Sequence, residues 1–509
     1  MILSALRSPH DVGPDSIPSG GASLGRWGWL VVALLTAALT ALSTYQSLCR
    51  YDALRSGWSW DLAYYNQWFW ALTQGDGTIT VRPLSAYAQE GPSVWKMNYL
   101  APIRLAIVPF YWLFPDPRTL LILQNVVFWW VVPAAYGLVR SESHSEGVAL
   151  SAAWLVPLTP LLWPLVWNDF RELQLVGPFV LWAIQGVRER SPRLAAVGIA
   201  GMLACRQEFA LVVATFALLP PQRDESLSVT LRWRRATVLI GLCWVVFGFF
   251  GYLKTMVGRG APDAFIDQFL GPKAPLHETL YTSGEALILG MGGWAVLAGL
   301  APRMAILAVP WIWSLCSGRW ALRFLSSTEW HHVRYAMPMA ILVLAAGLVG
   351  YARLATWLRK RPRGRVWLAL VWLGAVALGV VGVRDLTHRM GQIPVTIDRQ
   401  EAAAIWTWIR QVDPEDAVLA GYEVAAPLSS RRWLYSYVLD PNLPPGFPQL
   451  GSQFHWLLVG NDYYLLKPLL DQGFEVVHRG NHLTIARRGT VTLARNPDFF
   501  RFRANILPR

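Results

Sequence analysis

Long apolar segments recur along most of the first 384 residues and set the architecture that we expect. Most contain about twenty apolar residues, the length that a helix needs to cross the hydrocarbon core of a bilayer. The expected spans are 27–48, 99–114, 119–139, 147–167, 173–187, 194–219, 236–257, 284–300, 304–317, 335–357 and 366–383. We therefore predict a polytopic α-helical membrane protein with about eleven spans, some of them short or re-entrant.

Beyond residue 384 the apolar runs shorten to strand length and alternate with helix-like stretches. Strands are expected at Ala417–Ala420, Trp456–Val459, Phe474–Val477 and Leu483–Ala486, and helices near Arg399–Gln411 and Asp462–Gln472. Alternating strands and helices indicate a small α/β domain. We thus divide the chain into a polar leader (1–26), a membrane domain (27–384) with a first loop at about 49–98, and a soluble domain (385–509).

The apolar run 194–219 is interrupted by the charged segment Arg206–Glu208. We expect two half-helices, Leu194–Ala204 and Phe209–Leu219, with a bend between them. The bend keeps the basic loops on both sides of the run in the cytoplasm, as the positive-inside rule requires. A continuous span is the alternative. The bent form needs a second irregular segment upstream, and the short run 99–114 is the candidate because it contains two prolines and an arginine.

Composition and charge agree with a membrane protein. The chain is 54% hydrophobic and 15% charged, whereas soluble domains carry about 25% charged residues. The net charge is +13, but residues 385–509 carry 13 Lys+Arg and 12 Asp+Glu, so the excess belongs to the membrane domain. Its basic residues cluster in short loops, which is typical of membrane topology and argues against nucleic-acid binding. The basic loop 359–365 should be cytoplasmic, which puts residues 385–509 outside.

Charged side chains near bilayer depth are functional-site candidates, because they cost several kcal/mol unless they face a partner or a wet cavity. Asp61 follows the first span. Asp169 and Glu172 lie between two later spans, and Arg206 and Glu208 interrupt another. These residues are where we expect the chemistry of the protein.

Several of these segments resemble a family of bacterial polytopic membrane proteins, the domain of unknown function 2079, which is related to GT-C-type glycosyltransferases. The similar segments are Trp60–Trp70, Asn98–Pro102, Leu113–Leu121 with Gln124, Asp169–Glu172, Arg206–Leu211 and His332–Tyr335. Their order and spacing extend the resemblance over nearly the whole chain. It implies a location in the bacterial plasma membrane, with membrane lipids as neighbours.

This sequence departs from the family pattern at a few positions. Asn98 and Arg171 stand where the family often has histidine, and the proline before Glu172 is absent. Arg206–Glu208 replaces the family's Lys-Glu-Asp segment. The departures keep the acidic residues and put a step that depends on histidine in doubt.

The resemblance implies an enzyme that transfers a sugar from a polyprenyl-phosphate donor at the outer face of the membrane. Such a reaction needs a carboxylate to accept the proton of the acceptor hydroxyl, and Asp61 is the candidate base. Asp169 and Glu172 would orient the acceptor or, with Asp61, hold a divalent cation such as Mg²⁺ or Mn²⁺. Cations stabilise a phosphate leaving group. Substrate binding is assigned to Arg206, Glu208, Arg334, His331, His332 and Asn98.

Each assignment has a structural alternative. Asp61 suits the cap of an interfacial helix, and Asp169 and Glu172 could pair structurally with Arg171 or Arg206. Arg206 and Glu208 could neutralise each other as a buried pair, and His331 and His332 could be interfacial. The whole protein also has alternatives to an enzyme. A transporter or flippase would use the same charges as a substrate path, and a non-catalytic assembly protein would use the outer domain to bind a partner.

Overall fold

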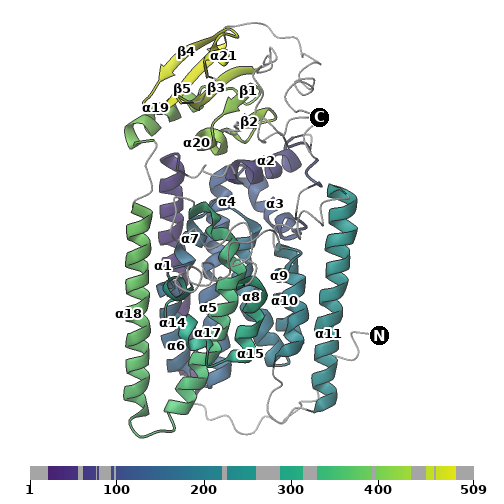
Figure 1. Ribbon diagram of the computed structural model, residues 1–509, viewed down its shortest axis with the longest axis vertical. Coiled ribbons are helices and arrows are strands. Elements are labelled where there is room, and N and C mark those ends of the chain that lie inside the picture. Colours follow the sequence, from purple (N-terminus) through teal and green to yellow (C-terminus); the bar gives the residue numbers. More distant parts are fainter. Residues whose placement is uncertain are drawn as a thin grey trace, which may run out of the picture.

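The computed structural model describes residues 21–55, 61–75, 77–79, 93–96, 99–219, 226–258, 287–312, 330–391, 397–436, 454–462 and 466–488. These residues form a tall bundle of helices with a small sheet domain at one end (Figure 1). The bundle contains α1 (Gly21–Asp52), α2 (Asp61–Thr73), α3 (Ile103–Leu113), α4 (Pro117–Trp129), α5 (Val131–Ser143), α6 (Glu146–Leu155), η3 (Val156–Leu158), α7 (Leu162–Trp167), η4 (Glu172–Leu175), α8 (Val176–Arg188), α9 (Pro192–Cys205), α10 (Phe209–Thr215), η5 (Phe216–Leu218), α11 (Leu227–Val245), η6 (Val246–Val257), α14 (Gly293–Ala298), α15 (Pro302–Ala305), η7 (Ile306–Ala308), η9 (Trp330–Ala336), α17 (Met337–Leu358) and α18 (Gly364–Gly391).

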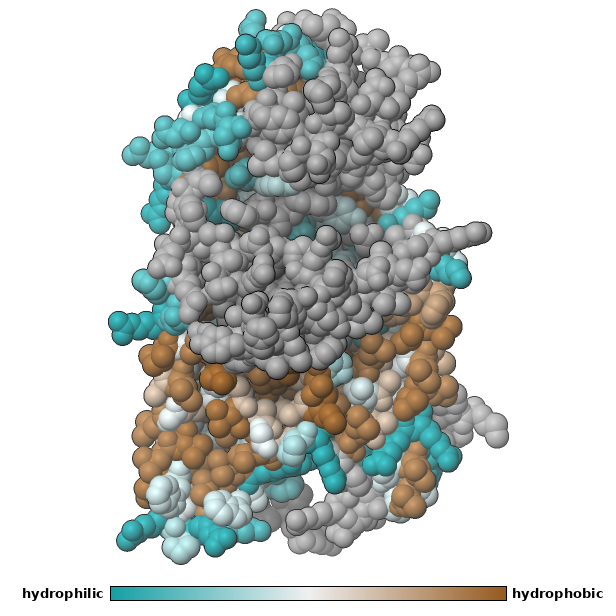
Figure 2. Space-filling view, viewed as in Figure 1, coloured by the Kyte–Doolittle hydropathy of each residue, from teal (hydrophilic) through white to brown (hydrophobic). Residues whose placement is uncertain are grey.

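The membrane class that the sequence predicts is confirmed. Within the described residues, five helices are long and apolar enough to cross a bilayer: Arg26–Asp52, Pro117–Ser143, Leu227–Met256, Val333–Leu358 and Gly364–His388. A band of hydrophobic residues covers the visible bundle in Figure 2, and hydrophilic residues gather at the end away from the sheet domain. The number of about eleven spans stays a prediction, because several apolar helices are too short to cross alone.

Burial separates an inner helix from the outer ones. α17 is apolar on all sides and buried over most of its length, as a helix in the interior of a bundle should be. α11 and α18 stand on opposite sides of the bundle in Figure 1, and they expose large apolar side chains such as Leu239 and Leu373. Outer helices of this composition require a lipid environment to cover them.

The break expected in the run 194–219 is present. α9 ends at Cys205 and α10 begins at Phe209, and the residue between them that caps α9, Arg206, has an extended backbone. The upstream segment is also irregular: α3 has only 11 residues and a proline at position 109, so it is about 17 Å long. The chain thus has the second irregular segment that the bent form needs.

The C-terminal part is the expected small α/β domain. It contains α19 (Arg399–Ile409), β1 (Ala417–Ala420), α20 (Tyr422–Ala425), η10 (Ala426–Leu428), β2 (Leu434–Ser436), β3 (Phe454–Gly460), α21 (Leu466–Leu470), β4 (Phe474–Arg479) and β5 (Leu483–Arg488). The sheet order is β2-β1-β3-β5-β4, with β1, β2 and β3 parallel and β5 antiparallel to its two neighbours. Leu419 of β1 lies opposite Leu457 of β3, and both belong to one buried cluster with Leu469 of α21.

The sheet domain rests on α2 through buried polar contacts. The Asn66 amide donates to the hydroxyls of Ser429 (2.8 Å) and Ser430 (3.0 Å), and its oxygen accepts from the Tyr111 hydroxyl (2.8 Å). The neighbouring Gln67 donates to the backbone oxygen of Arg431 at 3.0 Å. The segment that follows η10 is therefore held by the middle of α2.

Replacing Asn66 with Leu is expected to loosen the sheet domain. The Tyr111 and Ser429 hydroxyls lose a partner, and a buried polar group left unpaired costs about 1–3 kcal/mol. Hydrogen exchange in peptides covering residues 426–432 should rise, and the melting temperature should fall. Thr73→Val, which removes a hydrogen bond within α2, is the matched control and should leave this exchange unchanged. Equal exchange in Asn66→Leu and wild type would contradict the proposed contact.

Candidate active site

The first residue of α2, Asp61, is the meeting point of two distant arginines. Arg171 Nε donates to Asp61 Oδ2 at 2.9 Å, and its Nη2 contacts the other carboxylate oxygen. Arg334 Nη1, from η9, donates to Oδ2 at 2.5 Å. All three side chains are buried. Both oxygens of Asp61 are thus occupied by guanidinium groups, and three segments far apart in the sequence are joined.

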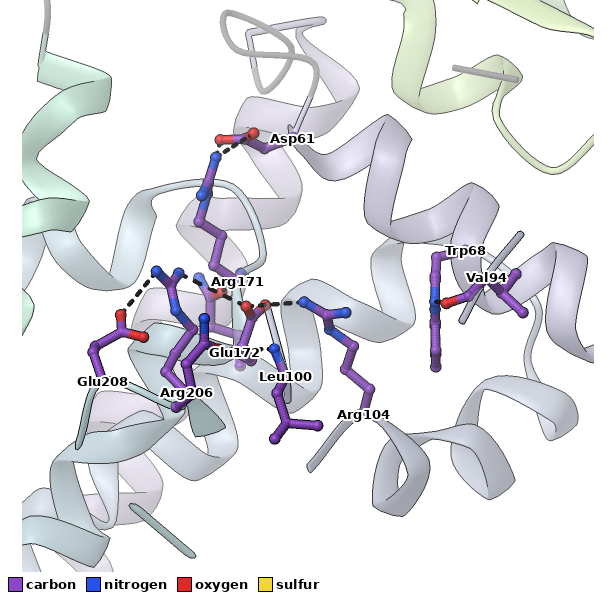
Figure 3. A network of polar contacts seen from close by, with 11 residues as sticks. Asp61, Trp68, Val94, Leu100, Arg104, Arg171, Glu172, Arg206 and Glu208 are labelled. Carbon is purple, nitrogen blue, oxygen red and sulfur yellow. Dashed lines mark hydrogen bonds and ion pairs between the residues drawn. The ribbon is translucent and has the colours of Figure 1, made fainter. Parts of the chain in front are cut away.

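A second set of ion pairs lies close by, around Glu172 at the start of η4 (Figure 3). Glu172 Oε1 accepts from Arg104 of α3 at 3.0 Å and is 3.8 Å from Nη1 of Arg206. The other end of the Arg206 guanidinium contacts Glu208 at 2.8 Å. The break between α9 and α10 therefore brings Arg206 and Glu208 to the acidic loop.

Asp169 lies in the loop between α7 and η4, and the pKa of its carboxyl is raised to about 7. Burial is the main cause, because it disfavours the ionised form, and the negative charge of Asp61 adds to the effect. Arg50, Arg334 and the backbone N–H of Leu62 act in the opposite direction. Asp169 therefore holds a proton more readily than an exposed aspartate does.

Aromatic rings cover the arginines. The guanidinium carbon of Arg206 is 3.4 Å from the centre of the Tyr99 ring, and that of Arg104 is 5.2 Å from the Tyr65 ring. Arg334 lies 5.1 Å from its neighbour Tyr335. Such contacts stabilise cations that have lost much of their water.

The cluster carries more positive than negative charge. Among the described residues, five arginines (Arg50, Arg104, Arg171, Arg206 and Arg334) act on four carboxyl groups (Asp61, Asp169, Glu172 and Glu208). The excess is one charge when Asp169 is ionised and two when it is protonated. Uncompensated charge is costly in a buried site, so the arrangement suits a bound anion.

The structure brings together most of the residues that the sequence singled out. Asp61, Asp169, Glu172, Arg206, Glu208 and Arg334 all belong to this cluster. Asn98 lies outside the described residues. His331 and His332 belong to η9, and their side chains lie outside the described part of the chain.

Three arginines of the cluster, Arg50, Arg104 and Arg171, were not assigned a role from the sequence. Arg104 is a charged residue inside an apolar segment, so the signal that identified Arg206 was present there too. Arg171 stood out only as a departure from a family histidine. Its partner, Asp61, is 110 residues away, and no local pattern predicts that pairing.

The residues suggested for a divalent cation do not fit a metal site. Within the described residues, no group of three or more His, Cys, Asp or Glu side chains could hold a metal ion. The oxygens of Asp61 contact guanidinium groups, and Glu172 is paired with Arg104. A cation at either carboxylate would meet fixed positive charge.

The fold is similar to that of a protein with solved crystal structures. ArnT from Cupriavidus metallidurans bound to undecaprenyl phosphate matches with a TM-score of 0.56 and 14% identity, over 90% of this chain and 98% of that chain. Its apo state matches with a TM-score of 0.53 and 14% identity, over 91% and 98%. At this identity the likeness shows a shared fold.

Comparisons at the level of sequence point to one family. A search of curated proteins finds no match. Residues 50–463 match the family model described as "Predicted membrane protein (DUF2079)". The match includes every charged residue of the cluster and most of both domains, and the chain therefore belongs to the DUF2079 family of membrane proteins.

Proposed function

We propose that this chain is a membrane glycosyltransferase of GT-C type, which moves a sugar from a polyprenyl-phosphate donor to an acceptor hydroxyl at the extracytoplasmic face. The fold of ArnT supports the class, and one ArnT structure contains undecaprenyl phosphate, a lipid of the same chemical class as the donor. The observation that carries the proposal is the excess of buried arginine charge around Asp61 and Glu172. A phosphate leaving group would complete the charge balance of that cluster.

The reaction moves one proton and breaks one bond. The acceptor oxygen attacks the anomeric carbon while the bond from that carbon to the phosphate oxygen breaks, and a carboxylate takes the acceptor proton. Negative charge then collects on the departing polyprenyl phosphate. Arg206 and Arg334 are the proposed phosphate contacts. Guanidinium groups held in place before the reaction stabilise such charge without reorganising.

Asp169 is a better candidate for the base than Asp61, the residue expected from the sequence. Both oxygens of Asp61 are engaged by Arg171 and Arg334, which makes it a poor proton acceptor. The pKa of Asp169, about 7, suits a general base that operates near neutral pH. In this assignment Asp61 anchors the arginines, and Glu172 and Glu208 orient Arg104 and Arg206.

The basic loops support an assignment of the side of the membrane that the site faces. The loop between α17 and α18, with its run of basic residues at 359–365, lies at the end of the bundle opposite the sheet domain in Figure 1. Short loops rich in Lys and Arg face the cytoplasm. The sheet domain and α2 would then face the extracytoplasmic side, where the acceptor is proposed to bind.

Asp169→Asn is expected to reduce sugar transfer at least 100-fold. The wild-type rate should fall about tenfold per pH unit below pH 7, because the base is lost as Asp169 is protonated. The measurement is transfer of radiolabelled sugar from a panel of synthetic polyprenyl-phosphate sugars. Asp471→Asn, at an exposed position of the sheet domain, is the matched control. Unchanged transfer in Asp169→Asn would exclude this base.

The melting temperature provides a second readout of the same group. The pKa of Asp169 is higher in the folded protein than in an unfolded chain, so its contribution to stability is complete in acid and is lost as pH rises through about 7. Asp169→Asn should remove this part of the pH dependence. A wild type that is inactive with every donor, with the pH dependence intact, would favour transport or assembly over transfer.

Cysteine labelling tests the direction of the chain. Single cysteines at Arg361 and Asp471, both exposed, would be introduced after removal of the four native cysteines. A membrane-impermeant maleimide should label position 471 in cells with a permeable outer envelope, and position 361 only after the plasma membrane is opened. The reverse pattern would put the sheet domain in the cytoplasm.

A further inference from the structure

We infer that Gln124 is a positioning residue, which holds the backbone of loop 168–171 and so sets the places of Asp169 and Arg171. The inference concerns the catalytic geometry and therefore rests on the proposed function. The holding contacts themselves can be tested without any activity. Gln124 was part of the sequence resemblance, but the transfer chemistry gives it no role.

The side chain of Gln124 is fully buried in α4 and uses both ends of its amide. Its Nε2 donates to the backbone oxygens of Asn168 (2.9 Å) and Val166 (3.2 Å). Its Oε1 accepts from the backbone N–H of Arg171 at 3.0 Å. One side chain thus joins the end of α7 to the last residue before η4.

The loop needs such a contact because its backbone is extended inside the bundle. Asn168 has φ −63° and ψ 159°, and Arg171 has φ −148° and ψ 144°. The Asn168 N–H donates to the Pro164 oxygen and the Arg171 oxygen accepts from the Gln174 N–H, whereas the Asn168 oxygen and the Arg171 N–H bond to Gln124. Buried backbone groups that a helix does not pair must find a partner elsewhere. Glutamine is suited to this role, because its side-chain amide offers two donors and an acceptor to the backbone of the loop.

α1 holds Trp167, the residue of α7 that comes directly before the loop. Arg50 Nη1 donates to the backbone oxygen of Trp167, and the indole N–H of Trp167 donates to Gln46 at 2.8 Å. Asp169 lies between Asn168 and Arg171 along the chain, and the backbones of these two residues both bond to Gln124. A shift of this loop would move the proposed base and would also pull Arg171 from Asp61, so the two changes should occur together.

The neighbouring residue provides a matched control. Asn125 is also a fully buried amide of α4, but its Nδ2 donates to Leu121 within the helix (2.7 Å) and to Ser47 (3.3 Å). Asn125→Leu removes buried hydrogen bonds without touching the loop. Gln124→Met removes the amide and keeps most of the volume. Gln124→Glu keeps an acceptor for the Arg171 N–H but loses donors to the two carbonyls.

Hydrogen exchange measured by mass spectrometry tests the holding contacts. In Gln124→Met, exchange in peptides covering 166–171 should be at least tenfold faster than in wild type, and in Asn125→Leu it should be unchanged. Gln124→Glu should keep most of the protection at Arg171, and Gln124→Leu, which has no hydrogen-bonding group, takes the place of Gln124→Met if that variant does not fold. Wild-type exchange in Gln124→Met, or in Gln124→Leu in its place, would overturn the inference.

Steady-state transfer from a polyprenyl-phosphate sugar tests the consequence for catalysis. A small misplacement of reacting groups costs about 100-fold in rate, so kcat of Gln124→Met should fall by that factor while KM stays within about threefold. Gln124→Glu should recover part of kcat. Equal kcat in Gln124→Met and Asn125→Leu would reduce Gln124 to a purely structural role. If wild type transfers no sugar, the proposed function fails, and the exchange result still judges the contact.

Discussion

The carboxylate of Asp61 is the interaction on which the site depends. It binds Arg171 and Arg334, which are 110 and 273 residues away along the chain. Ionised groups lose their hydration on burial, and a buried pair offsets that cost only with good geometry. Without Asp61, two buried cations would lose their closest anion. The positions of α2, the loop before η4 and the start of α17 are therefore interdependent.

α2 also connects the membrane part to the sheet domain. Asn66, which binds the segment after η10, is five residues from Asp61, or about 7.5 Å along the helix axis. Both faces of this short helix thus make buried contacts: one face binds the charged residues, and the other binds the sheet domain through amide groups. A shift of the sheet domain relative to the bundle would have to move α2, rearrange the amide contacts or break them. The domain is for this reason part of the framework of the site.

Local patterns predicted the elements better than the contacts between them. β1 lies at Ala417–Ala420 as expected, and the break at Arg206–Glu208 was visible because charge interrupts an apolar run. The strand β2 has only three residues and follows soon after two arginines, so its hydrophobic pattern is too short to be recognised. The pairing of Asp61 with Arg171 depends on how the bundle closes, which hydropathy does not encode. The choice between two nearby carboxylates as the base depends on that pairing.

The acidic residues have different roles because nearby arginines offset their negative charges to different extents. Asp61 and Glu172 are each next to two arginines, which they anchor. Asp169 is more affected by its burial and by the charge of Asp61, so its pKa lies near 7. Environments that separate the properties of neighbouring carboxyl groups allow one to bind while another transfers a proton. An excess of arginine charge beside such a carboxyl group matches a reaction in which an anion departs and a proton is taken up.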